Sequence, residues 1–146
     1  RLKIIGTGPQ EKELKQIVRD NNILNVEFMG YKEGNELMSL VANAKFVVVP
    51  SIWYENYPYV VLESHILGVP TLLSNIGGLP EMVIDKNNFL FKPGNIESLK
   101  EKIKELWNNK TLLNKTSKQV VEFVKENNDP GSFYNKLIKI YQEETI

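Results

Sequence analysis

The stretch FVVVPSIWYENYPYVVLESHILGVPTLL, residues 46–73, decides the fold. It opens with a continuous apolar run at 46–49, which is typical of a strand buried on both faces of a parallel sheet. A polar and aromatic loop follows, and residues 58–67 read as a helix. A second apolar run at 71–73 predicts another strand. Strand, loop, helix and strand in this order indicate a βαβ arrangement.

The same alternation continues on both sides of this stretch. Further apolar runs predict strands at 2–5, 26–29 and 89–91. Apolar residues at helical spacing predict helices over the intervening and following segments, at 14–21, 33–44, 80–84, 96–107, 113–124 and 133–141. We therefore expect an α/β fold: a Rossmann-like three-layer sandwich whose central parallel sheet has about five strands.

Composition excludes several classes of function. The chain has 146 residues, with 18 Lys and Arg against 18 Asp and Glu, so its net charge is zero. Nucleic acid is not expected as a partner, because a grip on phosphates needs a basic excess. Cysteine is absent and His65 is the only histidine, which excludes thiolate zinc sites, iron–sulfur clusters and histidine-rich metal sites. We also expect no other metal and no cofactor. No apolar run approaches the roughly 18 residues of a membrane span, and we expect a cytoplasmic protein.

Ligands of open parallel sheets bind beyond the carboxyl ends of the strands. The longest loop at that edge, residues 51–58, carries Glu55, and Glu63 follows in the predicted helix. The amide groups at the start of a helix suit a phosphate. Carboxylates instead accept hydrogen bonds from hydroxyl groups, which predicts a sugar or ribose diol. Two alternatives stay open: Trp53 and Tyr54 serve packing alone, and Glu63 is a solvated helix residue.

A pair of glycines follows the strand at 71–73. Gly77 and Gly78 allow positive φ and the close approach of a ligand to the backbone. Pro80 then begins a short helix. The alternative interpretation is an ordinary turn between strand and helix.

These residues together resemble the C-terminal half of the retaining glycosyltransferases of family 4, which have the GT-B fold. The family pattern is Pro-Ser, a Glu, seven residues, a second Glu, and Gly-x-Pro. Here it reads Pro50-Ser51, Glu55, Glu63 and Gly68-Val69-Pro70. The segment Gly77-Gly78-Leu79-Pro80-Glu81 matches the next motif, and Gly6-Thr7-Gly8-Pro9 and Val26-Glu27-Phe28-Met29-Gly30 match earlier ones. The likeness covers nearly the whole chain in order.

The resemblance implies a domain that binds a nucleoside diphosphate sugar without a metal. Glu55, the candidate catalytic residue, would bond the hydroxyls of the donor sugar and orient it rather than attack it. Glu63 would hold the ribose hydroxyls. The remaining donor-binding positions would act mainly through their backbone: Gly8 in the first loop, Met29, Gly30 and Tyr31 at the base, and Asn56, Tyr57 and Pro58 at the sugar and diphosphate.

The chain departs from the family pattern at three places. Asn56-Tyr57-Pro58 stands where Gly-Phe-Gly is common, and Pro58 has no N–H to offer a phosphate. Asn87-Asn88 stands where a glycine is usual, which predicts a turn. Ser64-His65 replaces Ala-Met, so His65 is interpreted as a helix-packing residue rather than a base.

The resemblance also implies that residues 1–146 are the C-terminal nucleotide-sugar-binding domain of a longer enzyme. The first strand and helix of this domain would be missing, together with an Arg and a Lys that neutralise the diphosphate. The N-terminal acceptor domain would be missing too, so we expect no turnover by this chain alone. The acceptor would be a glycan or a lipid-linked sugar, and peripheral contact of the parent enzyme with the inner face of a membrane stays open.

Two rival functions are weighed against the transferase. A nucleotide-sugar epimerase would share the GT-B architecture but need no acceptor. A non-catalytic signalling module of receiver type would need an Asp at a strand end, and none stands there. A classical dinucleotide-binding loop is excluded as well, because Glu11 occupies the place of its third glycine.

Overall fold

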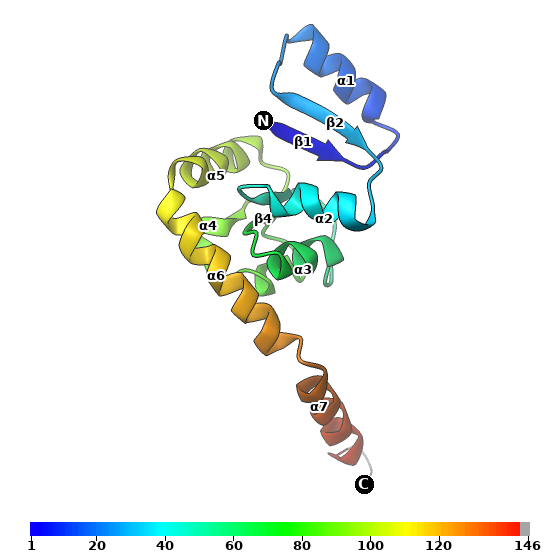
Figure 1. The fold of residues 1–146 in the computed structure, drawn as a ribbon, viewed down its shortest axis with the longest axis vertical. Coiled ribbons are helices and arrows are strands. Elements are labelled where there is room, and N and C mark those ends of the chain that lie inside the picture. The colour runs from blue at the N-terminus through cyan, green and yellow to red at the C-terminus, as the bar shows by residue number, and fades with distance from the viewer. Residues whose placement is uncertain (144–146) are drawn as a thin grey trace. The chain divides into compact units, whose positions relative to one another are not determined.

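The computed structural model describes residues 1–143. It divides into two compact units, Arg1–Leu40 and the part from Val41 onward. Each unit is described by itself, and Figure 1 gives the order of their elements.

The first unit is a strand–helix–strand arrangement. Strand β1 (Leu2–Ile5) and strand β2 (Val26–Gly30) are parallel, with Leu2 opposite Val26 and Ile4 opposite Phe28. Helix α1 (Glu11–Asp20) connects them, and its Lys15 ammonium lies 5.5 Å from the centre of the Phe28 ring. No residue of 1–40 is fully buried. Helix α2 (Gly34–Ala42) leads from β2 into the second unit.

The second unit contains a three-stranded parallel sheet in the order β3–β4–β5. Its strands are β3 (Val47–Val49), β4 (Thr71–Ser74) and β5 (Leu90–Phe91). Its helices are α3 (Tyr59–Ile66), η1 (Leu79–Glu81), α4 (Lys86–Phe89), α5 (Ile96–Asn108), α6 (Lys110–Asn127) and α7 (Pro130–Glu143). The hydrophobic core lies here and is built from Val49, Val61, Leu72, Leu73, Leu79, Met82, Val83, Phe89, Phe91, Leu106 and Leu113.

The predicted α/β class and its five parallel strands are confirmed. Backbone hydrogen bonds among residues 1–143 join the strands as a pair and a triple rather than as one continuous ladder. The continuously apolar strand β4 is buried at every position, as expected for a strand covered on both faces.

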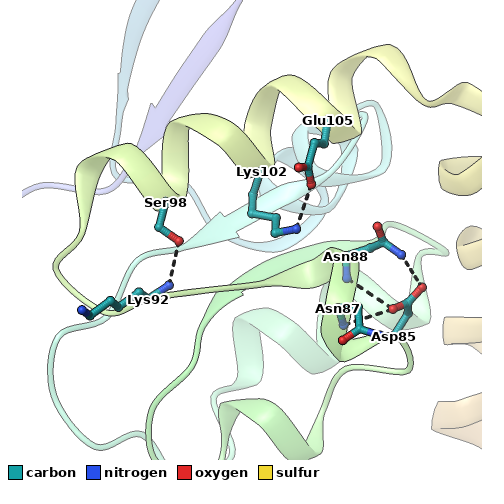
Figure 2. Close-up of polar contacts among 7 residues, drawn as sticks. All are labelled: Asp85, Asn87, Asn88, Lys92, Ser98, Lys102 and Glu105. Atoms are coloured by element: carbon teal, nitrogen blue, oxygen red, sulfur yellow. Dashed lines mark hydrogen bonds and ion pairs between the residues drawn. The ribbon is translucent and has the colours of Figure 1, made fainter.

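The sequence misplaced the elements between β4 and β5. The predicted helix at 80–84 is a short 3₁₀ turn at Leu79–Glu81, and the predicted strand at 89–91 is only Leu90–Phe91 because Phe89 ends α4. The turn predicted at Asn87-Asn88 is wrong too. Figure 2 shows why: the Asp85 carboxylate accepts the backbone N–H groups of Asn87 and Asn88 at 3.1 and 3.2 Å, which caps a helical turn.

Side-chain caps also determine where α5 begins. The Asn95 side chain accepts the Ser98 backbone N–H at 2.8 Å. The Ser98 hydroxyl in turn accepts the Lys92 N–H at 3.1 Å, as Figure 2 shows. By contrast, α7 has no buried residue, and the stripe predicted on it is largely exposed at Phe133, Ile140 and Tyr141. None of the helices within residues 1–143 combines the length and apolar character needed to cross a lipid bilayer.

Candidate functional site

The loop between β3 and α3, residues 50–58, is hereafter the Glu55 loop. Its second residue, Ser51, is buried, and the chain then turns outward, so that Trp53 and Tyr54 are exposed. Glu55 itself is half-buried. The loop leaves the carboxyl end of a parallel strand, which is the edge where the sequence predicted a ligand.

The main chain of Glu55 rests directly on the paired glycines. The Gly78 N–H donates to the Glu55 carbonyl at 2.7 Å. A Cβ atom added to Gly78 would lie 2.1 Å from the Asn56 carbonyl oxygen, and one added to Gly77 would lie 2.6 Å from the Glu55 oxygen. Gly77 also has φ +57°, a conformation that other residues rarely adopt. From the sequence we expected a ligand to approach these glycines. In the structure it is the backbone of the Glu55 loop that lies against them, and a side chain at either glycine would collide with it.

Two side chains of the same loop hold the Glu55 carboxylate. The Trp53 indole N–H donates to Glu55 Oε1 at 2.8 Å, and the Ser51 hydroxyl donates to the same oxygen at 3.0 Å. Trp53 is 62% exposed, so the alternative in which it serves packing alone is wrong. The exposed Trp53 ring instead contributes a hydrogen bond that holds the Glu55 carboxylate.

The far end of the loop is tied to the end of α6. The Tyr57 hydroxyl donates to the side-chain oxygen of Asn128 at 3.0 Å. Pro58 is the N-cap of α3 and its carbonyl accepts the Val61 N–H at 3.1 Å, so the helix begins at Tyr59 rather than at Pro58 as predicted. Pro58 lacks an N–H and the Val61 N–H is taken by the Pro58 carbonyl, so the amides of Tyr59 and Val60 are the free donors of this terminus.

Helix α3 is anchored by burial. Its inner face contains Val61, Ser64 and His65, all at most 1% exposed. It ends in a Schellman motif, in which the N–H groups of Gly68 and Val69 donate to the carbonyls of His65 and Ser64 at 2.9 and 2.8 Å.

The second carboxylate, Glu63, lies on α3. The side chain is half-buried, and among residues 1–143 its carboxylate takes part in no hydrogen bond or ion pair. Its open acceptor positions suit the hydroxyl groups of a ligand and suit water equally, so the alternative of a solvated helix residue stays open.

The lone histidine is a packing residue, as predicted. His65 is 1% exposed, its Nε2 lies 2.9 Å from the Thr71 hydroxyl, and its ring meets Phe123 edge-on at 6.4 Å. Burial lowers the pKa of His65 from 6.5 to about 4, so the ring is neutral at physiological pH. Its burial against Thr71 and Phe123, rather than its charge, keeps this ring from acting as a base on a ligand at the surface.

The other expected site residues lie in the first unit. The Gly6 N–H donates to the Gly30 carbonyl at 2.8 Å, which brings the loops after β1 and β2 together, and Gly30 has φ +65°. The Gly8 carbonyl accepts the Glu11 N–H where α1 begins. The Tyr31 hydroxyl donates to Glu33 at 2.7 Å, and this bond raises the pKa of the exposed phenol.

The structure thus gathers the predicted residues into two groups. Gly8, Met29, Gly30 and Tyr31 stand at the strand ends of the first unit, whereas Asn56, Tyr57, Pro58, Glu55 and Glu63 belong to the second. Their union in one donor site stays a prediction. The sequence did not indicate that Ser51 and Trp53 donate hydrogen bonds to the Glu55 carboxylate. Their spacing of four and two residues before Glu55 was the available signal.

Comparison with known proteins identifies the family of the chain. Residues 1–126 match the family model described as "Glycosyl transferases group 1". An uncharacterized glycosyltransferase of Methanocaldococcus jannaschii is 36% identical over 126 residues, which are 86% of this chain and 36% of that protein. This chain therefore spans about a third of the length of that relative.

The fold has relatives among solved structures. The chain is similar to Anabaena HepE in complex with UDP, with a TM-score of 0.81 at 20% identity over 97% of this chain and 40% of that one. HepE in complex with UDP-glucose gives a TM-score of 0.79 at 22% identity, with the same coverage of 97% and 40%. These similarities establish the α/β domain as one half of a GT-B architecture.

Proposed function

The chain belongs to the glycosyl transferases group 1 family, and from that premise we propose that it is the donor-binding domain of a retaining hexosyltransferase. The parent enzyme moves a hexose from a nucleoside diphosphate sugar to an acceptor hydroxyl. The observation that carries the proposal is the pair of carboxylates: Glu55, presented by an exposed loop, and Glu63, unpaired on the helix that follows. Family membership removes the signalling-module alternative.

Each carboxylate has a separate task in this proposal. Glu55 accepts hydroxyl groups of the donor sugar and orients its ring. Glu63 accepts the two ribose hydroxyls, which its open acceptor positions suit. The backbone at Asn56, Tyr57 and Pro58 meets the sugar and diphosphate, and Gly8, Met29, Gly30 and Tyr31 accommodate the base.

The leaving diphosphate needs stabilisation of its growing negative charge. The free amides at the start of α3 carry partial positive charge and can donate hydrogen bonds to a phosphate. The basic residues and the acceptor site of the family are expected outside this chain, so we propose that this chain alone binds donor without transferring it. The acceptor is a glycan or a lipid-linked sugar.

Uridine is the base that we propose first. The titles of the HepE structures name UDP and UDP-glucose as the ligands of that protein, whose fold this chain shares. An epimerase of the same architecture is the second candidate. Incubating the full-length protein with donor alone and analysing the products separates the two, because an epimerase converts the donor sugar without an acceptor.

The test of donor binding is an amide-resolved NMR titration with UDP, GDP and ADP in parallel. We expect one nucleotide to shift residues 30–31 and 55–63 selectively and so to identify the base. No response from the full-length protein to any of the three at millimolar concentration contradicts the proposal. A response of the full-length protein alone assigns the lost affinity to residues outside this chain.

A further inference from the structure

The Glu55 carboxylate is already bound before any ligand arrives. Trp53 Nε1 and Ser51 Oγ both donate to it, at 2.8 and 3.0 Å. Both bonds go to the same oxygen, Oε1. Among residues 1–143 no hydrogen bond reaches Oε2, so one oxygen of the carboxylate is occupied and the other is open.

The two donors come from different surroundings. Ser51 is buried and stands two residues after the end of β3, so its position depends on the sheet. Trp53 is mostly exposed, and its indole N–H can donate but cannot accept, so it can only bond the carboxylate oxygen. The main chain of Glu55 is meanwhile held by Gly78. Glu55 therefore has little freedom left at either end.

We propose that Trp53 and Ser51 are positioning residues that preset Glu55, so that Oε2 faces the hydroxyl groups of the donor sugar. This inference rests on the proposed function. A carboxylate fixed by internal donors loses less conformational freedom when it binds, and its open oxygen accepts from a defined direction. The exposed tryptophan of the loop thereby serves recognition of the sugar and not of the nucleotide.

The test uses Trp53→Phe and Ser51→Ala in the full-length protein, with binding of UDP-glucose and of UDP measured by calorimetry. Where the nucleotide titration selects another base, the matching nucleotide and its glucose conjugate replace them. We expect Trp53→Phe to weaken UDP-glucose binding about tenfold, the size of one lost hydrogen bond, and to leave UDP binding unchanged. Trp107→Phe is the matched control, since it makes the same change on α5. In a Glu55→Ala background Trp53→Phe should cost nothing more.

A spectroscopic readout tests the hydrogen bond without activity. The chain has two tryptophans, so its spectrum holds two indole N–H signals. Glu55→Ala should move the Trp53 signal and leave the Trp107 signal in place, and UDP-glucose should move the Trp53 signal in the wild type.

The outcomes separate two failures. If UDP-glucose and UDP bind normally to Trp53→Phe, or if both weaken equally, the positioning role is overturned while the proposed function stands. A wild-type protein that binds no UDP-, GDP- or ADP-linked sugar overturns the proposed function, and the positioning role with it.

Discussion

The Glu55 loop and helix α3 are neighbours in the chain but hold their carboxylates by opposite means. Residues 52–54 of the loop are exposed, and its shape depends on polar contacts with Gly78, Ser51 and Trp53. Helix α3 is held by a buried face and by the packing of His65. One carboxylate is consequently oriented by hydrogen bonds, and the other by the burial of the helix that carries it.

This difference separates two kinds of sensitivity. A loop held by a few close backbone contacts fails when one contact is blocked, because no buried area compensates. A helix held by a buried face instead responds to changes in the core. Substitutions that distinguish these responses can test the comparison.

The largest effect is expected from Gly78→Ala. Gly78 has an ordinary φ of −81°, so the obstacle to alanine is steric, and the nearest atom is the Asn56 oxygen, 2.1 Å from the new Cβ. The loop must shift, and a displacement of about 1 Å at a site costs roughly 100-fold in activity. Donor binding by calorimetry and turnover of the full-length protein measure this. Gly131→Ala, where the nearest neighbour lies at 3.4 Å, is the control. A Gly78→Ala protein with normal donor binding would contradict the loop's dependence on this contact.

Acid should destabilise the fold through the buried histidine of helix α3. Burial lowers the pKa of His65 to about 4 from 6.5, so the unfolded chain binds this proton first as the pH falls. The free energy of unfolding should be unaffected by this group above pH 6.5 and should fall by about 3 kcal/mol as the pH is lowered from 6.5 to about 4. Urea denaturation at several pH values measures the loss.

The matched variant for this pH effect is His65→Met, which places an uncharged side chain at the same buried position. It should flatten the dependence between pH 6.5 and 4 whatever its stability at neutral pH. An unchanged slope would assign the acid sensitivity to other groups.

Removing each carboxylate should separate the sugar from the nucleotide. Glu63→Ala is expected to weaken both UDP and UDP-glucose by roughly 10- to 100-fold, because a charge-assisted hydrogen bond contributes about 1.5–3 kcal/mol. Glu55→Ala should weaken UDP-glucose alone. Calorimetry with the two ligands decides between these patterns. Equal effects of Glu55→Ala on both ligands would place this carboxylate at the nucleotide instead.

The smallest effect is expected at the far end of the Glu55 loop. Tyr57→Phe removes the hydrogen bond to Asn128 and should lower stability by about 0.5–1 kcal/mol. Tyr59→Phe, on the first turn of α3, is the control. Hydrogen exchange should show faster exchange of loop amides in Tyr57→Phe alone. Identical exchange in the two variants would exclude Asn128 as an anchor of the loop.

Periodicity alone predicted the α/β class, the five strands and the order of the helices. The short apolar run at 71–73, bounded by Pro70, predicted a strand, and β4 (Thr71–Ser74) is buried at every position. The prediction of elements from periodicity failed between residues 79 and 91. Asp85 caps a helical turn with its own side chain, and such a cap depends on dihedral angles that a list of residues does not contain.

For the candidate site, too, some features could be predicted from the sequence and others required the tertiary structure. Glu55 and Glu63 could be selected from the sequence because their spacing and the motifs around them are properties of the chain itself. That Gly77 and Gly78 support the Glu55 loop could only be decided by the tertiary structure. More than twenty residues separate the two segments, and only the parallel pairing of β3 with β4 brings their following loops to one edge. The sequence determined which residues are the candidates for the chemistry, and packing decided how they are held, because close contact is a relation between segments.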